Sequence, residues 1–241
     1  GTNTERLRIT SVGKVGISSA TPTNNLTIHS NDNNQFAIKS GDSNADIVLA
    51  DSGGSSRLRF SNSQFEIWTG GAAGSYYAQN SARRLAVTSS GYLQKLNNPS
   101  FRAGLNSNTT FASSADIVFN DVSATWHHNN GNHYNTSNGR FTAPVSGVYH
   151  FDACVIFGPN ITNNLFMGDA FLFYINGGYA CYSGRRGYYV SGTTGNQYYT
   201  DHISCRFQMN ATDYITVRNG SPWTGVHGNT YYTWFAGTFL G

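Results

Sequence analysis

The sequence predicts an all-β protein, and three of its features support that prediction. Between Val148 and Phe157 one set of alternate residues is apolar throughout, which is typical of a strand with one side on a core; its members are Tyr149, Phe151, Ala153, Val155 and Phe157. Short alternating runs joined by polar turns recur in the N-terminal part. Gly, Asn, Ser and Thr fill the gaps between strands, and only 11% of the 241 residues are charged.

Charge and hydropathy argue against two classes of partner. The net charge is +3, and the only basic doublets are Arg83-Arg84 and Arg185-Arg186, whereas a nucleic-acid surface needs clustered Lys and Arg. No apolar run approaches the roughly 20 residues that a membrane-spanning helix needs. The chain opens on Gly1 rather than Met and carries no secretion signal, so we expect an excised fragment or a processed product.

A hairpin unit repeats before residue 99. Residues 6–15 align with residues 84–93, and a third copy at 57–65 keeps the strand and the turn but not the Gly. One hairpin cannot bury an apolar face alone, so we expect intertwining with other chains to supply the burial. Strands are also predicted around residues 34–41, 45–53, 57–71 and 75–80. The predicted domains are a shaft repeat (1–30), a small β-domain or β-prism (31–98) and a C-terminal domain (99–241).

Strands of the C-terminal domain can be placed from alternation and turn residues. They are predicted at 140–142, 148–157, 170–176, 179–185, 200–209, 214–219 and 230–240. Successive antiparallel strands place their connections alternately at the two ends of a sheet. The long connections are 158–169, 186–199 and 220–229, and the tight turns are 177–178 and 210–213. All the long connections should therefore lie at one end, where a rigid scaffold would present them for binding.

The long connections are rich in Tyr, Trp and amide side chains, which suits sugars because aromatic faces stack on C–H patches and amides hydrogen-bond hydroxyls. The same side chains suit packing between subunits equally well. The predicted glycan-binding residues are Asn163, Arg186, Tyr188, Tyr189, Tyr198, Tyr199, Trp223 and His227, and their neighbours in these connections include Asn160, Asn164, Arg185, Asn196, Gln197 and Asn229. In the last strand, a core or subunit-interface position is predicted for Tyr231, Tyr232, Trp234 and Phe235.

The three cysteines, Cys154, Cys181 and Cys205, all fall inside predicted strands. An odd number in such positions favours buried free thiols over a disulfide framework. Assembly in a reducing cytosol is then the simplest context.

Neither a cofactor nor an enzymatic activity is predicted. Adjacent His127 and His128, with His133, would point to opposite sides of an extended chain, which favours a solvated loop over a metal site. The C-terminal domain contains no Glu, and its Asp residues are spread over separate elements, whereas a glycosidase needs two facing carboxylates. No G-x-S-x-G, H-E-x-x-H or phosphate-loop motif appears. An active site shared between chains is left open.

One block of residues resembles the signature of C1q-like domains, the jelly-roll trimers related to tumour necrosis factor. It consists of Tyr134-Asn135-Thr136, Gly139-Arg140-Phe141-Thr142-Ala143-Pro144, Gly147, Tyr149 and Phe151, and the segments 99–108, 171–178 and 235–241 also match. The resemblance implies a homotrimeric jelly-roll head over 99–241, with the shaft entering at the short-turn end and the long connections at the tip. Some such trimers hold calcium near the tip, and Asp169 and, more weakly, Asp201 are the acidic candidates here; no ion is predicted.

A second resemblance concerns residues 5–28, ERLRITSVGKVGISSATPTNNLTI, which look like the shaft motif of bacteriophage tail fibres. Ser18, Ser19 and Ala20 replace the usual Gly-Thr-Thr. The resemblance implies a virion tail-fibre protein that is assembled in the host cytoplasm, contacts other tail proteins and adheres to a bacterial surface polysaccharide or lipopolysaccharide. Two alternatives stay open: a purely structural trimerisation module and a polysaccharide depolymerase.

Overall fold

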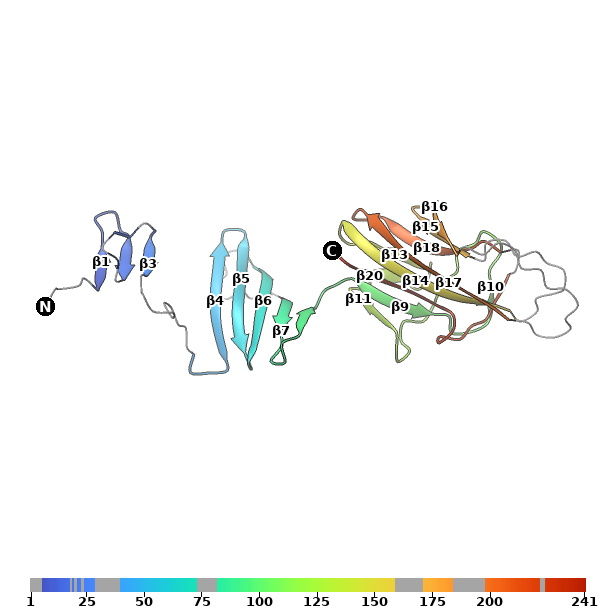
Figure 1. Cartoon of the computed structure of the whole chain (residues 1–241), viewed down its shortest axis with the longest axis horizontal. Coiled ribbons are helices and arrows are strands. Elements are labelled where there is room, and N and C mark those ends of the chain that lie inside the picture. Colours follow the sequence, from blue (N-terminus) through green and yellow to red (C-terminus); the bar gives the residue numbers. More distant parts are fainter. Residues whose placement is uncertain are drawn as a thin grey trace, which may run out of the picture. The chain divides into compact units, whose positions relative to one another are not determined.

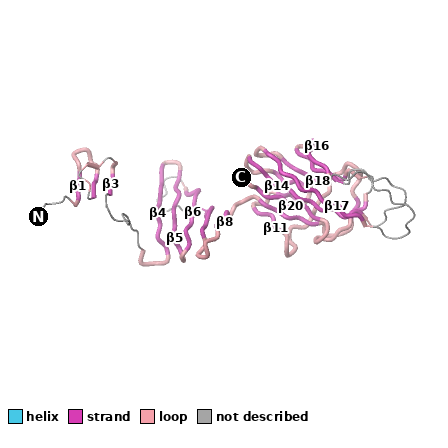
Figure 2. The backbone as a smooth tube through the Cα atoms, in the orientation of Figure 1, coloured by secondary structure: helices cyan, strands magenta, loops and turns pink. Residues whose placement is uncertain are grey.

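The computed structural model describes residues 6–17, 19, 21–22, 24–28, 40–72, 82–158, 171–183, 198–221 and 224–241. Over these residues the chain is built of strands and loops only, which confirms the all-β prediction (Figures 1 and 2). None of the described segments forms a helix long and apolar enough to cross a membrane. The chain divides into two compact units, Gly1–Leu96 and Asn97–Gly241; we call the second unit the head.

The first unit begins with a three-stranded sheet of β1 (Leu7–Ile9), β2 (Val15–Ile17) and β3 (Leu26–Ile28). β1 and β2 form an antiparallel hairpin, and β3 joins β2 in parallel. In the hairpin turn the Thr10 N–H donates to the Lys14 carbonyl at 2.9 Å, and the Lys14 N–H donates to the Thr10 hydroxyl at 3.0 Å. Gly13 has a φ of 81°, a backbone conformation that favours glycine.

A five-stranded antiparallel sheet follows in the order β4 to β8, with bounds Asn44–Asp51, Gly54–Ser61, Gln64–Gly71, Ala82–Val87 and Leu93–Lys95. The β7–β8 turn repeats the first turn bond for bond: Thr88 and Tyr92 exchange the same two hydrogen bonds, and Gly91 has a φ of 84°. Between β5 and β6, Asn62 and Ser63 adopt positive φ in place of the Gly. The hairpin repeat is therefore confirmed in all three copies. The predicted strands near 34–41 and 75–80 fall almost entirely outside the described residues.

The head contains two antiparallel sheets. A seven-stranded sheet runs β10-β19-β14-β20-β9-β11, with β17 also on β14; its strands are β9 (Ser100–Gly104), β10 (Thr109–Thr110), β11 (His128–Asn130), β14 (Gly147–Phe157), β17 (Tyr199–Met209), β19 (Gly225–Val226) and β20 (Trp234–Phe239). The five-stranded sheet runs β12-β13-β18-β15-β16; its strands are β12 (Tyr134–Asn135), β13 (Arg140–Thr142), β15 (Phe171–Ile175), β16 (Gly178–Tyr182) and β18 (Tyr214–Asn219).

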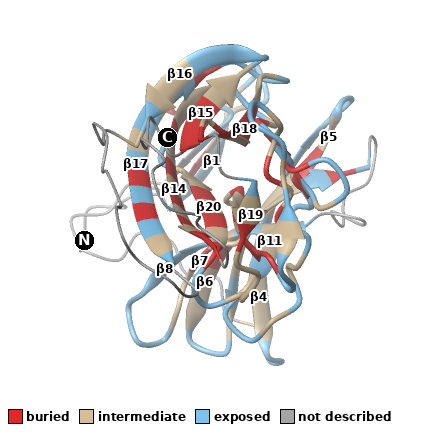
Figure 3. Cartoon of the chain, turned by 90° about the vertical axis from the view of Figure 1, so that its right-hand side faces the viewer, coloured by how far each residue is buried: buried red, intermediate tan, exposed pale blue. Residues whose placement is uncertain are grey.

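The core of the head lies between these sheets and is strongly aromatic. The five predicted inward residues of β14 are all buried, which confirms the alternation. The Phe151 ring has its centroid within 6.4 Å of five other aromatic rings, those of Phe141, Tyr149, Phe173, Phe207 and Phe235. In Figure 3 the buried positions, in red, gather in the head strands, and β17 is banded red and pale blue. Burying each large apolar side chain contributes about 1.5–3 kcal/mol.

One buried polar group in this core is satisfied by the backbone. Tyr134 is 3% exposed, and its hydroxyl donates a 3.0 Å hydrogen bond to the Phe119 carbonyl. Burial raises the pKa of this phenol far above its usual value, so Tyr134 stays neutral and acts as a donor. Its ring stacks on Phe101 at 4.6 Å.

The two ends of the head differ as predicted. Phe157 of β14 pairs with Tyr199 of β17, and Phe171 of β15 pairs with Asn219 of β18, so the strand ends that flank the long connections meet at one end. At the other end Asn176 donates to Asp213 at 2.8 Å and so joins the two tight turns. We call these the loop end and the turn end.

Both chain ends of the head lie at the turn end. The side chain of Asn98 donates to the Phe239 carbonyl at 3.0 Å, and the Val148 N–H donates to the Gly241 carbonyl at 2.8 Å. The chain therefore enters the head beside its last strand, as expected.

The cysteine prediction is wrong for two residues. Cys181 of β16 and Cys205 of β17 form a disulfide, and only Cys154 is free. Each of these strands is the edge of its sheet, so the disulfide ties the two sheets together. Counting cysteines could not reveal that two edge strands of different sheets meet. Because disulfides are rare in a reducing cytosol, the cysteines no longer favour cytosolic assembly. Burial and, to a smaller extent, Asp201 raise the pKa of the Cys154 thiol.

Two local predictions are also corrected. The predicted loop at Trp126, His127, His128 and His133 is interrupted by a strand, because β11 begins at His128 and pairs with β9 at the sheet edge through main-chain bonds that need no apolar alternation. Trp126, His127 and His133 lie outside the strands. Tyr231 and Tyr232 precede the last strand and are 62% and 54% exposed, so neither lies in that strand or in the monomer core, and the alternative of a subunit interface stays a prediction. Phe235 is buried as predicted.

Candidate functional site: an aromatic cluster at the loop end

The structure describes three of the eight predicted binding residues: Tyr198, Tyr199 and His227. Tyr199 opens β17 and its side chain packs against the core, whereas Tyr198 is 51% exposed. Several predicted residues and neighbours lie outside the described residues: Asn163, Arg186, Tyr188, Tyr189 and Trp223, together with Asn160, Asn164, Arg185, Asn196 and Gln197.

The turn that carries His227 is firmly attached to the scaffold. The His227 N–H donates to the Ile156 carbonyl at 2.8 Å, and the His227 carbonyl accepts from the Thr233 hydroxyl at 2.6 Å. The next residue, Gly228, donates to the side chain of Asn108 at 2.8 Å. A Cβ on Gly228 would overlap the backbone of Ser107, so this close approach requires glycine.

Three rings form a cluster around this turn. The centroids of Tyr198 and His227 are 5.0 Å apart with an interplanar angle of 67°, an edge-to-face contact. The ring centroids of Tyr232 and His227 are 6.5 Å apart, and the two rings are nearly parallel, with an interplanar angle of 19°. We call Tyr198, His227 and Tyr232 the loop-end cluster. The cluster joins a long connection to the segment before β20, and its two tyrosines remain half-exposed.

Sequence reasoning missed Tyr232 because alternation placed it in the last strand. A turn at Asn229 delays the start of that strand to Trp234. The Asn229 carbonyl accepts the N–H groups of Tyr232 and Thr233 at 2.9 Å, and its side chain accepts from the Tyr231 N–H at 2.9 Å. An Asn that hydrogen-bonds the backbone two residues on is a turn signal, and the Gly-Asn-Thr run at residues 228–230 could have revealed it.

The three histidines considered as metal ligands occupy separate places. His127 Nε2 lies 3.2 Å from the Thr230 carbonyl and so helps to hold the loop-end turn. His128 lies in β11 opposite Arg102, and burial, followed by the neighbouring charges, lowers its pKa. His133 packs edge-on against Phe141. Within the described segments no three His, Cys, Asp or Glu side chains gather as metal ligands.

Of the two acidic candidates for calcium, Asp169 lies outside the described residues and Asp201 is 8% exposed. One Asp201 oxygen accepts from the His202 N–H at 2.9 Å, and the other has no partner among the described residues. A single buried carboxylate does not make a calcium site, which needs six to eight oxygen ligands.

A polar network on the outer face of the seven-stranded sheet was not foreseen. His150 Nε2 lies 2.9 Å from the Ser204 hydroxyl, and His150 Nδ1 lies 3.6 Å from Asp152. The order of groups is that of a serine hydrolase, but the second distance exceeds hydrogen-bond length and all three side chains lie on an open sheet face. A shallow hollow of about 340 Å³ beside them is lined by His150, Asp152, Arg102, His128, Ser100 and Thr238.

Comparison with known proteins finds one family match and several similar solved structures for the head. The C1q domain family matches residues 100–170. Similar solved structures include the globular domain of zebrafish complement 1qA protein (14% identity, TM-score 0.43, 60% of this chain and 98% of that chain). Eiger TNF from S. frugiperda has 11% identity and a TM-score of 0.43, and it covers 60% and 94% of the two chains. Murine APRIL has 13% identity and a TM-score of 0.42, and the match covers 59% of this chain and 99% of that chain. No curated protein matches the chain. The C1q match covers residues 100–170, and the head has the two packed antiparallel sheets of a C1q-like jelly roll.

Proposed function

We propose that the chain is the receptor-binding end of a homotrimeric appendage of the bacteriophage tail-fibre type, carried on the virion beside other tail proteins. Its loop end adheres to a bacterial surface glycan, a polysaccharide or a lipopolysaccharide. The observation that carries this proposal is the loop-end cluster: two half-exposed tyrosines held on an imidazole by a fixed turn. The shaft motif at residues 5–28 supports the type of appendage, and the C1q-like head supports the trimer.

The chemistry of the cluster suits a sugar ring. The exposed faces of Tyr198 and Tyr232 offer apolar surfaces for the C–H groups of a pyranose, while their hydroxyls and nearby amides can exchange hydrogen bonds with its hydroxyls. Among the described residues the buried His227 Nδ1 has no hydrogen-bond partner, and the imidazole ring contacts both tyrosine rings. Because the turn is already ordered by its hydrogen bonds, little conformational entropy is lost on binding.

Binding of the full chain to a panel of bacterial cells and to a glycan array, alongside its mass in solution, tests the proposal. We expect a trimer that binds saturably. Tyr198→Ala and Tyr232→Ala should each weaken binding about tenfold, or about 1.4 kcal/mol, and leave the trimer intact. Tyr92→Ala, at a 72% exposed tyrosine of the first unit, is the matched control and should bind normally.

The other outcomes separate the alternatives. A trimer without binding on a broad panel would leave a purely structural trimerisation module. Release of soluble saccharide during prolonged incubation with host polysaccharide would establish a depolymerase instead. A monomer would overturn the architecture.

A further inference from the structure

The five-stranded sheet of the first unit carries an apolar face that runs across all its strands. The register places two rows of side chains side by side on this face. One row is Ile47, Leu58, Ile67 and Leu85, ending at Lys95, and the other is Ala45, Phe60, Phe65, Val87 and Leu93. We call these two rows the apolar face.

The opposite face of the same sheet is charged and internally paired. Arg59 donates to both oxygens of Asp46 at 2.8 Å, and Arg83 donates to Glu66 at 2.7 Å. The Arg57 guanidinium lies 4.3 Å from the ring centroid of Trp68. Although burial alone would raise it, hydrogen bonds from Arg83 and Trp68 hold the pKa of Glu66 below its usual value. The polar groups of this side are therefore satisfied within the sheet itself, and Glu66 is only 6% exposed.

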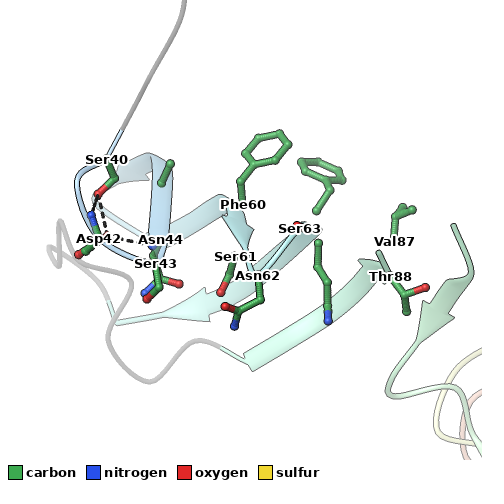
Figure 4. Close-up of a pocket in the computed structure, with 13 residues that line it drawn as sticks. Ser40, Asp42, Ser43, Asn44, Phe60, Ser61, Asn62, Ser63, Val87 and Thr88 are labelled. Carbon is green, nitrogen blue, oxygen red and sulfur yellow. Dashed lines mark hydrogen bonds between the residues drawn. The ribbon is translucent and has the colours of Figure 1, made fainter. Parts of the chain in front are cut away.

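Nothing in the described part of the first unit buries the apolar face. Phe60 is 55% exposed, Leu93 is 61% exposed and Ile47 is 37% exposed. Figure 4 shows Phe60 and Val87 standing on one side of the sheet and Ser61 on the other, beside a hollow of about 400 Å³ at the sheet end. Among the described residues of the five-stranded sheet, the only buried apolar side chain is Ala86, which belongs to the charged face. A one-layer sheet of this kind needs a second layer.

We propose that this apolar face packs against the same face of two further copies of the chain, so that three sheets enclose a common core around a threefold axis. The inference rests on the homotrimer of the proposed function, which brings three identical faces together. Ile47, Leu58 and Ile67 occupy the middle of β4, β5 and β6, so their row lies nearest the axis. Lys95 ends this row at the edge strand β8, where a charge guards against further strand addition.

The area of the apolar face fits copies of the chain that are also held together by another part of the molecule. Five strands at about 4.8 Å spacing and about 20 Å length give about 480 Å² of flat face. That is roughly three fifths of the about 800 Å² that each partner contributes to a standard stable interface. The face is too small to hold a dimer alone, but it suits copies that the head already holds together.

Cysteine cross-linking of the full chain tests the inference. Cys154→Ser removes the free thiol, and a single cysteine is then placed at Ile47 or at Val48, adjacent β-branched residues of β4 that face opposite sides of the sheet. Under mild oxidation Ile47→Cys should give a covalent dimer on non-reducing denaturing gels. The dimer should hold at most about two thirds of the chains, because three cysteines at one axis form one pair. Val48→Cys should stay monomeric on the gel.

Each other outcome has a distinct meaning. A trimeric mass with no dimer from Ile47→Cys would overturn the inference and leave the proposed function standing. Equal cross-linking from Ile47→Cys and Val48→Cys would also overturn the inference, because cross-linking would then not depend on which face of the sheet carries the cysteine. Nearly complete conversion to dimer, with a dimeric mass, would replace the threefold arrangement by a twofold one. A monomeric mass without binding to cells would refute the proposed function itself.

Discussion

Gly228 offers the sharpest test of the loop end. In Gly228→Ala the new Cβ would overlap the backbone carbonyl of Ser107 and the N–H of Asn108, and no side-chain rotation can relieve that contact. The turn must move away from the scaffold. The hydrogen bonds that hold it would then break, namely those that join His227 to Ile156, Gly228 to Asn108 and Thr233 to His227.

The expected loss follows from these bonds. Each contributes about 0.5–1.5 kcal/mol, so three together give about 1.5–4.5 kcal/mol. Replacing Gly by Ala also restricts the unfolded chain, which returns about 0.4–1 kcal/mol. The head should therefore lose about 0.5–4 kcal/mol of unfolding free energy, with a fall in Tm of about 2–4 °C for each kcal/mol.

Urea unfolding followed by tryptophan fluorescence measures this loss, and glycan binding measures its effect on the loop-end cluster. Binding should fall by at least the tenfold expected for Tyr198→Ala, because His227 moves with the turn. Gly41→Ala is the control: nothing lies within 4 Å of the added Cβ, so stability and binding should not change. A Gly228→Ala head within about 0.5 kcal/mol of the parent, with unchanged binding, would refute the reasoning.

Three further predictions concern the core, acid stability and the cysteines. Phe151→Ala should destabilise the head by about 3–5 kcal/mol in urea unfolding, because the fully buried ring contacts five others; a loss under 1 kcal/mol would contradict the aromatic core. The hydrogen bond from Arg59 lowers the pKa of Asp46 in the folded state. The stability that this ion pair adds is therefore complete above the unfolded pKa of about 3.9 and is lost as pH falls through the folded pKa. Asp46→Asn should flatten that part of the acid-denaturation profile of the first unit, and a profile identical to the parent would count against the ion pair. Thiol titration of the denatured, unreduced chain should find only Cys154 reactive, whereas three reactive thiols would contradict the Cys181–Cys205 pairing.

Much of the fold could be predicted from the sequence because the responsible signals are local. The alternation in β14 decides which side chains face the core, and the register then follows from one buried face. The Thr and Gly of the hairpin copies at residues 6–15 and 84–93 specify a turn by their own hydrogen bonds and φ, so similar sequences have the same geometry. Connection lengths sufficed to separate the loop end from the turn end.

The features that escaped prediction depend on contacts between distant segments. β11 is a strand only because β9 lies beside it, and its Asn-rich sequence carries no apolar period. Cys181 and Cys205 meet because two edge strands of different sheets converge. The loop-end cluster required Tyr232, whose exposure follows from the turn at Asn229, and no periodicity rule includes such a turn.

The shared position of Asn98 and Gly241 at the turn end makes the head a natural display scaffold. Because these two ends lie beside the same strands, a short linker could join them and new termini could open in the connection between β16 and β17. A protein fused after Gly241 would leave from the side opposite the long connections. Foreign sequences grafted into those connections would therefore remain accessible, and the aromatic core would not need to be redesigned.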